Sequence, residues 1–154
     1  MQYTVYLSGE IHSDWREKIQ AAVKSRQLPI TLLTPNTHHE SSDDCGNKIL
    51  GQEDKPFWKD HKAAKINTVR HMTAIERADI VVVRFGDKYK QWNAAFDAGI
   101  AIAKGKSLIV EHADDITHPL KEIDAAASAV ASNTEQVIEI LTYLTLDYSL
   151  NDPS

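Results

Sequence analysis

The chain has 154 residues, of which 42% are hydrophobic and 25% are charged, and its formal net charge at pH 7 is −5. A chain of this length buries roughly 70% of the surface that its unfolded form exposes, and this composition is that of an ordinary globular domain, which excludes disordered and fibrous classes. Acidic and basic residues are mixed along the chain, so binding to a nucleic-acid polymer, which needs clustered lysine and arginine, is not expected.

The sequence shows no pattern that would direct the chain to a membrane. No apolar run approaches the ~20 residues that span a bilayer, and residues 1–10 lack the basic region and long apolar region of a signal peptide. We therefore expect a cytoplasmic protein whose partner is a small molecule or another copy of itself, as a homo-oligomer. The single cysteine, Cys45, excludes an intrachain disulfide and a CxxC motif.

Strand and helix patterns alternate along the chain, as judged from β-branched runs, helical apolar spacing and turn residues. In chain order they are a strand at 3–7, a helix from Ser13 to about 26, a strand at 30–33, a helix at 63–77, a strand at 80–83, a helix at about 92–104, a strand at 108–110, a helical segment after 118–119 and a helix at about 134–146. Residues 36–60 lose this periodicity and predict a long surface loop with at most a short helical turn near Ile49, and such a loop is usually functional or mobile.

This alternation predicts an α/β fold of the doubly wound, flavodoxin- or Rossmann-like type. A mostly parallel sheet of about four to five strands has helices on both faces. The single domain is expected to cover residues 1–148, followed by a C-terminal tail at 149–154. Because such folds bind ligands beyond the carboxyl ends of their strands, the turns that follow the strands are the places to search for a site.

Several familiar site motifs are missing. The sequence contains neither GxGxxG after the first strand, nor GxxxxGK[ST], nor GxSxG, so dinucleotide binding, triphosphate binding and ester hydrolysis through those loops have no support. None of the seven histidines is placed as HExxH, and the adjacent His38 and His39 cannot share one helix face. We expect neither a cofactor nor a metal site.

Asp97 is the candidate for chemistry, because it lies one or two turns into the predicted helix at 92–104, on the side that faces the strand ends. Ala94, Ala95 and Ala98 leave space around it, and Gly99 permits close packing. An anion in the early turns of a helix is stabilised by the helix dipole and stays ionised. From spacing alone, a functional carboxylate and a polar residue on a helix surface are equally good interpretations.

Two segments, VYLSGEIH and ADIVVVRFGDKYKQWNAAFDAGIAIAKGKSLIVE, resemble the nucleoside 2-deoxyribosyltransferase family and the related deoxynucleotide N-glycosidases. A second resemblance, to the YtoQ-like proteins of the same superfamily, spans nearly the whole chain through GEIH, FGxKYKQWNxAxDA, AxGKxLI and HPLKE. The resemblance implies a doubly wound fold, cleavage of an N-glycosidic bond without a cofactor, and a nucleoside or nucleotide as substrate. A nucleoside-binding protein that has lost the chemistry is the alternative.

The resemblance also assigns roles to residues. It makes Asp97 the glycosyl nucleophile, at the position where the family carries a glutamate, and makes Tyr6 the residue that holds or polarises this carboxylate. Gly9 belongs to the small-residue turn after the first strand. The family's acidic residue of the preceding helix falls near His71, and the carboxylate just upstream of the nucleophile is met by Gln91.

Glu10 and His12 end the first strand, where each is either a pocket residue or part of an ordinary solvated turn. With His71, they are the candidates to protonate a departing base. Arg84 ends the central strand and either binds a phosphate or carboxylate or pairs with a nearby aspartate. His118 either lines the pocket or simply begins a helix.

Aromatic and amide side chains follow the central strand. Tyr89 and Trp92 can stack on a base, although burial in the core is the favoured interpretation for Trp92. Asn93 either caps the helix or binds a sugar hydroxyl.

Overall fold

Five short strands form one sheet in which every neighbouring pair is parallel, in the order β2-β1-β3-β4-β5. The computed structural model describes residues 1–88 and 90–149, so Tyr89 and, apart from Ser149, the predicted tail at 149–154 lie outside the described residues. The strands are β1 (Tyr3–Gly9), β2 (Ile30–Leu33), β3 (Ile80–Arg84), β4 (Ser107–Glu111) and β5 (Ala129–Ala131). The predicted doubly wound α/β fold is confirmed, and β5 is a strand that the sequence patterns did not single out.

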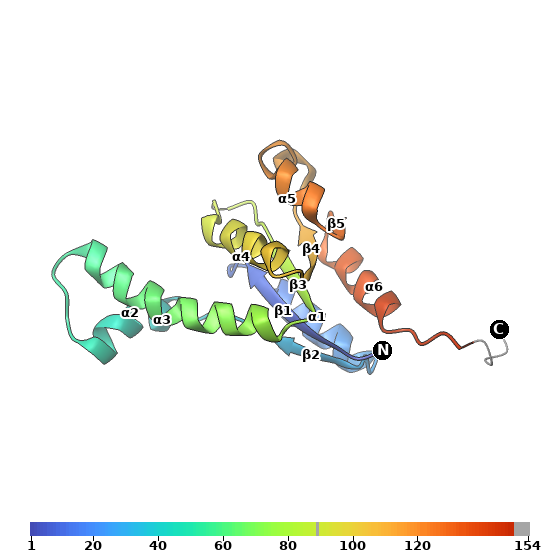
Figure 1. The fold of residues 1–154 in the computed structure, drawn as a ribbon, viewed down its shortest axis with the longest axis horizontal. Helices are drawn as coiled ribbons and strands as arrows, with labels where there is room; N and C mark the ends of the chain where they lie inside the picture. Colours follow the sequence, from blue (N-terminus) through green and yellow to red (C-terminus); the bar gives the residue numbers. More distant parts are fainter. Residues whose placement is uncertain (89, 150–154) are drawn as a thin grey trace.

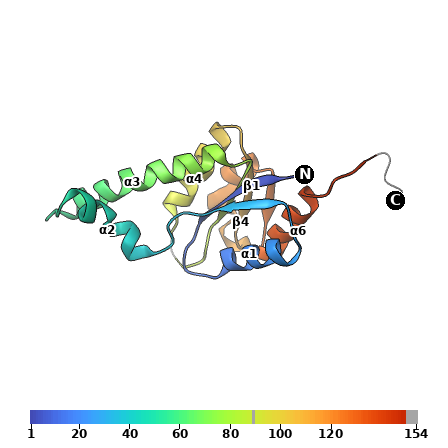
Figure 2. The same cartoon turned by 90° about the horizontal axis from the view of Figure 1, so that it is seen from below.

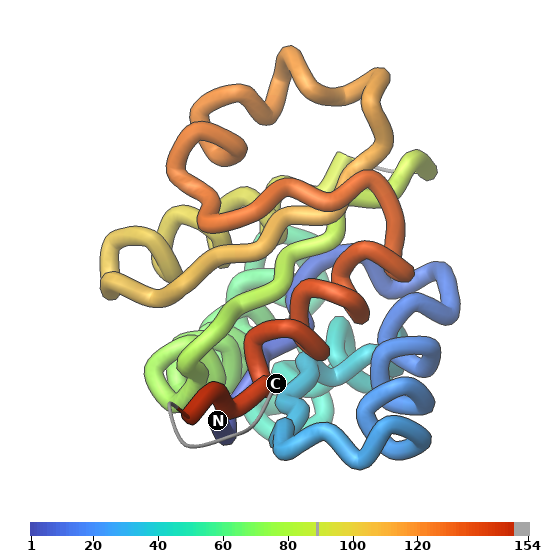
Figure 3. Tube along the Cα trace, turned by 90° about the vertical axis from the view of Figure 1, so that its right-hand side faces the viewer, coloured from blue at the N-terminus to red at the C-terminus, as the bar shows by residue number. Residues whose placement is uncertain are grey.

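Helices cover both faces of the sheet. α1 (Trp15–Ser25) and α6 (Thr134–Leu144) pack on one face, and α3 (Pro56–Arg77), α4 (Trp92–Ala103) and α5 (Lys121–Ala126) pack on the other. Two short 3₁₀ segments, η1 (Asp114–Ile116) and η2 (His118–Leu120), precede α5. Figure 3 shows α1 and α6 on one side of the strands and α3 and α4 on the other.

Alternate residues of the central strands enter two separate cores because side chains of a strand point to opposite faces. In β3, Val81 and Val83 belong to the core under α3 and α4, whereas Ile80 and Val82 belong to the core under α1 and α6. All four are almost completely buried. This double burial explains the unbroken apolar run of β3, which is typical of a central parallel strand.

α4 lies close to the sheet because its inward face is built from alanines. Ala94, Ala98 and Ala101 are fully buried against the strands and present only a methyl group each. Asp97 lies on the same inward side of the helix and is 2% exposed. The small side chains thus bring the backbone that carries Asp97 near the end of β1.

The predicted loop at 36–60 is wrong, because most of it is helical. α2 (His39–Leu50) forms a hairpin with the first part of α3, which begins at Pro56 and not near residue 63. Figures 1 and 2 show this α2–α3 hairpin extending away from the sheet. Because α2 packs mainly against one helix and not against the sheet, it needs few apolar residues and leaves no helical apolar stripe in the sequence.

Polar interactions and one glycine define α2. The imidazole Nδ1 of His38 accepts a hydrogen bond from the Ser41 backbone N–H at 3.2 Å, which caps the helix. A Cβ at Gly46 would lie 2.5 Å from the Cβ of Lys62 and 2.6 Å from the Ala63 nitrogen. Only glycine therefore lets α2 approach α3 this closely.

The apolar stripe predicted for the last helix, α6, packs inside the protein. Val137 and Leu141 are buried in the core under α1 and α6, and Ile140 and Leu144 pack against that core. The stripe is therefore used within the chain and is not left for contact with another copy. Within the part of the chain that the structure describes, no helix has the length and apolar character needed to cross a membrane.

His112 at the end of β4 makes stability depend on pH. Burial alone would lower its pKa, but hydrogen bonds to the Ala113 carbonyl and the Asp124 carboxylate, together with the carboxylate charge, raise the pKa above the ordinary value of 6.5. A raised pKa in the folded state means that this contribution to stability is fully present below pH 6.5 and is lost as the pH rises through the folded pKa. We expect Asp124→Asn to lower Tm by several degrees at pH 5.5 and by clearly less at pH 9, as measured by differential scanning fluorimetry.

The matched control is Asp115→Asn, which removes an exposed carboxylate from η1. Its effect on Tm should be small at both pH values. An equal loss of Tm in Asp124→Asn at pH 5.5 and pH 9 would contradict the role of the charged pair.

Candidate active site

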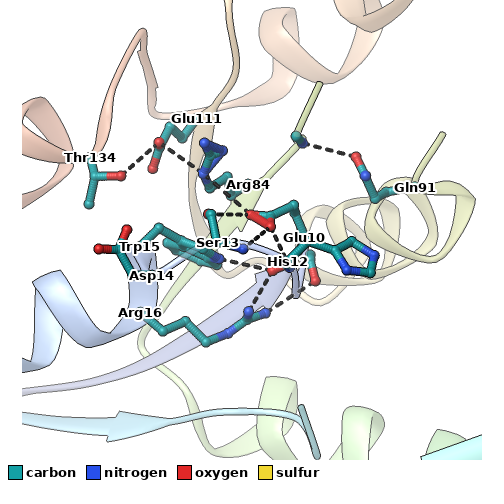
Figure 4. A network of polar contacts seen from close by, with 12 residues as sticks. Glu10, His12, Ser13, Asp14, Trp15, Arg16, Arg84, Gln91, Glu111 and Thr134 are labelled. Carbon is teal, nitrogen blue, oxygen red and sulfur yellow. Dashed lines mark hydrogen bonds and ion pairs between the residues drawn. The ribbon is translucent and has the colours of Figure 1, made fainter. Parts of the chain in front are cut away.

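The turn after β1 is held by the carboxylate of Glu10, which is 4% exposed. Its Oε1 accepts hydrogen bonds from the backbone N–H of His12 at 2.5 Å and of Ser13 at 2.6 Å, and its Oε2 accepts from the Ser13 hydroxyl at 2.8 Å. Figure 4 shows this arrangement. Both oxygens of Glu10 are thus engaged in the turn, which favours a structural role over proton transfer.

Gly9 is required at the same turn. Its φ is +105°, and a Cβ there would collide with the carbonyl oxygen of Arg84 on the neighbouring strand. That carbonyl accepts a hydrogen bond from the Glu10 N–H at 3.0 Å, so the strands stay in contact up to the turn. The glycine lets the chain leave β1 without separating β1 from β3.

Arg16, on the first turn of α1, binds the carbonyl oxygens at the end of β1. Its Nε donates to Leu7 at 3.1 Å, and its two terminal nitrogens donate to Glu10 at 2.5 Å and to Gly9 at 3.1 Å. The Trp15 indole N–H also donates to the Glu10 carbonyl, at 2.9 Å. Burial lowers the pKa of Arg16 to about 10, so the guanidinium is still charged at neutral pH.

Arg84 at the end of β3 lies between two buried carboxylates. Its Nε is 3.7 Å from Oε2 of Glu10 and 3.3 Å from Oε1 of Glu111. Burial raises the pKa of Glu111, and the Thr134 hydroxyl and the Arg84 charge oppose that rise. Arg84 therefore pairs with Glu10 and Glu111, and not with the nearby aspartates considered from the sequence.

Asp97 meets two side chains from other elements. The Ser8 hydroxyl on β1 donates to its Oδ2 at 2.5 Å, and Nδ1 of His71 on α3 lies 3.4 Å from the same oxygen. Ser8 is 1% exposed, and the side chain of His71 is 26% exposed. Both contacts are to Oδ2, so they fix the orientation of the carboxylate and leave Oδ1 outside these two interactions.

Tyr6 lies next to His71 and is fully buried. Its hydroxyl has no hydrogen-bond partner among the described residues, and its ring packs edge-on against the His71 ring at 6.5 Å. Burial, followed by the charge of Asp97, raises the pKa of Tyr6, so the phenol is neutral. The resemblance gave Tyr6 the role of holding or polarising the Asp97 carboxylate, and in the structure the Ser8 hydroxyl makes the hydrogen bond to that carboxylate.

A cavity of about 300 Å³ opens at the carboxyl end of β1, and the segments that follow β2 and β3 contribute to its lining. The predicted residues in its lining are Gly9, Glu10, His12, His71, Asn93 and Asp97. α2 contributes His39, Ser42 and Asp43 to the same lining, so the hairpin forms one wall of the cavity. Among the described residues, no group of three or more His, Cys, Asp or Glu side chains is placed to hold a metal ion.

The remaining predicted residues lie elsewhere. Tyr6 lines a different cavity, between α3 and β2, and Arg84 is in the ion-pair cluster described above. Trp92 is 74% exposed, so the expectation that it packs in the core is wrong, and it does not line the cavity at Asp97. His118 is exposed in η2 and does not line that cavity either. Asn93 is within α4, whose cap is Gln91, so it is not the capping residue.

Sequence patterns missed Ser8, Arg16 and the α2 wall. Ser8 precedes the glycine of the predicted strand end and could have been found by asking which side chains share that edge with Asp97. Arg16 carries no motif, and its role becomes visible only when the carbonyls it binds are located. His39 was placed in a loop, where its side chain had no predicted direction.

Comparisons with known proteins show the family to which the chain belongs. The family described as "Nucleoside 2-deoxyribosyltransferase YtoQ" matches residues 6–145. The "Uncharacterized protein YtoQ" of Bacillus subtilis (strain 168) is 46% identical over 144 residues, which cover 94% of this chain and 97% of the relative. The chain therefore belongs to the YtoQ family of the nucleoside 2-deoxyribosyltransferases.

Solved structures show a similar fold at low identity. A conserved protein from Enterococcus faecalis V583 has a TM-score of 0.59 at 15% identity, covering 94% of this chain and 99% of that one. A 2-deoxyribosyltransferase from Bacillus psychrosaccharolyticus has a TM-score of 0.49 at 17% identity, covering 96% of this chain and 93% of that one. The first of these structures supports the fold assignment.

The Arg16 contacts generate a prediction about stability. Arg16→Lys keeps the charge but replaces a planar fork of donors by one ammonium, which cannot reach three carbonyls at once. We expect the free energy of unfolding to fall by about 2 kcal/mol, since buried carbonyls lose charged partners. Urea denaturation measures this loss.

Arg26→Lys is the matched control, because Arg26 is exposed and its side chain bonds Thr142 and Glu139 at the surface. Its unfolding midpoint should stay that of the parent. An unchanged unfolding midpoint in Arg16→Lys would show that the guanidinium hydrogen bonds to the carbonyls at the end of β1 do not contribute to stability.

Proposed function

We propose that the protein cleaves the N-glycosidic bond of a deoxyribonucleoside or deoxyribonucleotide, with Asp97 acting on the anomeric carbon. The observation that carries this proposal is the buried Asp97 carboxylate, oriented by Ser8 and His71 at the wall of a 300 Å³ cavity. Family membership supports the class of reaction. A carboxylate held in one orientation is suited to attack a carbon that develops positive charge.

The chemical step follows from the two Asp97 oxygens. Oδ2 stays with Ser8 and His71, and Oδ1 attacks the anomeric carbon, so that a C–O bond forms as the glycosidic C–N bond breaks. The electron pair of that C–N bond passes to the base nitrogen, which takes up a proton. Water or the nitrogen of a second base then displaces Asp97 and releases the sugar, as hydrolysis or transfer.

His71 is the preferred proton donor to the departing base among the three candidates from the sequence. Both oxygens of Glu10 accept hydrogen bonds within the turn, and His12 is exposed. His71 alone of the three lies next to Asp97, and its side chain is partly accessible from the cavity. Proton transfer needs such proximity to the reacting bond.

A protein that binds nucleosides without cleaving them is the second candidate. It is favoured by one observation, the aspartate at position 97, which is one methylene shorter than the glutamate of the related transferases. Incubation with a panel of deoxynucleosides and deoxynucleotides, followed by chromatography of free base, separates the two functions. Release of base supports the enzyme, and binding without release supports the second candidate.

Substitution of Asp97 tests the proposed nucleophile. Asp97→Ala and Asp97→Asn should each reduce base release by at least about 10³-fold, because one removes the carboxylate and the other removes its charge. Near-ultraviolet circular dichroism should show that both variants keep the fold. Asp60→Asn, an exposed aspartate on α3 outside the cavities, serves as the control and should release base at the parent rate.

If Asp97→Ala releases base as fast as the parent, Asp97 is not the catalytic group. The roles given to Ser8 and His71 would then fail with it, because both act on this carboxylate.

We also propose that the protein works in the cytoplasm as a homo-oligomer. The apolar stripe of α6 is buried, but exposed apolar side chains gather where the α2–α3 hairpin turns. They are Ile49, Leu50, Phe57 and Trp58, each at least 48% exposed. Such a group on a soluble domain is typical of an interaction surface.

The prediction is that light scattering at micromolar concentration gives a mass above that of one 17.2 kDa chain. The double variant Phe57→Ser/Trp58→Ser should shift the mass to that of a monomer, because it removes the two largest apolar side chains of the surface. Tyr148→Ser, at an exposed aromatic residue near the end of the described chain, should leave the mass unchanged. A monomeric parent protein would contradict the proposed association.

A further inference from the structure

A second cavity, of about 200 Å³, lies between α3 and α4 and meets the first cavity at Asp97. The two share His71, Asn93 and Asp97 in their linings. A ligand whose reacting atom is at Asp97 can therefore extend into both. The site is bipartite, with the carboxylate at the junction.

The linings of the two cavities differ in character. The first is bordered by polar groups such as Ser8, Gln91 and His39. The second is bordered by the apolar side chains of Met72, Phe96 and Ile100. A ligand with one hydroxylated half and one flat, less polar half matches this division.

Phe96 is the distinctive side chain of the second cavity. On α4 it directly precedes Asp97. It lies one turn before Ile100, so the spacing of the helix places the Phe96 and Ile100 side chains along the same groove. Phe96 is 62% exposed, which leaves much of its ring uncovered. Trp92, one of the two aromatic residues that the sequence offered for stacking, borders neither of the two cavities at Asp97.

We propose that the cavity between α3 and α4 is the subsite for the heteroaromatic base of the substrate, with Phe96 as the surface on which the base stacks. The deoxyribose then occupies the first cavity, which is the more polar of the two, and the bond between sugar and base lies at Asp97, where the two cavities meet. Exposed Thr68 and Asn93 border the base subsite and supply hydrogen-bonding groups for the edge of the base. This inference rests on the proposed function, because it uses Asp97 as the reacting group.

The experiment measures binding and not turnover. Free adenine, free thymine and free 2-deoxyribose are titrated separately against the parent protein and followed by ligand-observed NMR. The variants are Phe96→Ala, Phe96→Tyr and the control Tyr143→Ala, which removes an aromatic residue of similar exposure, 65%, from α6 on the opposite face of the sheet.

Phe96→Ala should weaken the binding of at least one free base about tenfold, because stacking on an aromatic face is lost. Phe96→Tyr keeps a flat ring and should bind that base like the parent. The affinity for 2-deoxyribose should not change in Phe96→Ala, and Tyr143→Ala should match the parent with every ligand.

Equal base binding in Phe96→Ala and the parent, or no binding of either base to the parent at millimolar concentration, overturns the proposal. If Phe96→Ala converts an oligomer to a monomer while base affinity is unchanged, Phe96 covers an interface between copies and the proposal also fails. The proposed function can fail while the subsite is confirmed. In that case base binding would depend on Phe96, but the protein would release no base from any deoxynucleoside.

Discussion

The site depends on the guanidinium of Arg16, which holds three carbonyl oxygens at the end of β1. A parallel strand that ends under a helix leaves its last carbonyls without partners from the sheet, and buried carbonyls without partners are costly. Arg16 satisfies them from the first turn of α1. In the turn that follows, the Glu10 side chain accepts two backbone N–H groups and is buried at the edge of the cavity.

The charges at this edge are separated into two groups. Glu10 and Glu111 flank the single Arg84 in a buried cluster, while Asp97 lies with Ser8 and His71 in the cavity. The first group binds strand ends together, since its members come from the loop after β1, from β3 and from β4. Asp97 has no arginine or lysine among its hydrogen-bond and ion-pair contacts in the described residues, so its negative charge is not neutralised by a permanent cation. The Asp97 carboxylate is therefore left available for the attack proposed above.

The sequence predicted the parts of the fold in which burial imposes a pattern. The central strands show short apolar runs and the helices that cover them show helical apolar spacing, and the structure contains them all. α2 packs mainly on one helix and is rich in polar residues, and β5 has three residues and one buried side chain, so neither has a pattern that burial would impose. In the candidate site, Asp97, Glu10 and Asn93 are brought to one cavity because β1 and β3 are neighbours and α4 follows β3. Ser8 acts through one hydrogen bond to Asp97 and Arg16 through three to backbone carbonyls, and neither set of contacts leaves a periodic signal.

The close approach of α4 to the sheet bears on the aspartate at position 97. The methyl groups of Ala94, Ala98 and Ala101 set a short distance between the α4 backbone and the strands, and Asp97 already reaches the Ser8 hydroxyl at 2.5 Å. A side chain longer by one methylene has no room to extend straight toward Ser8, so its carboxylate would have to lie at a different place along the cavity wall. The shorter carboxylate is thus matched to a helix that lies close to its sheet. The position of the helix and the length of the side chain together determine where the carboxylate lies. The effect of replacing glutamate by aspartate at this position therefore depends on the alanines that set the position of α4.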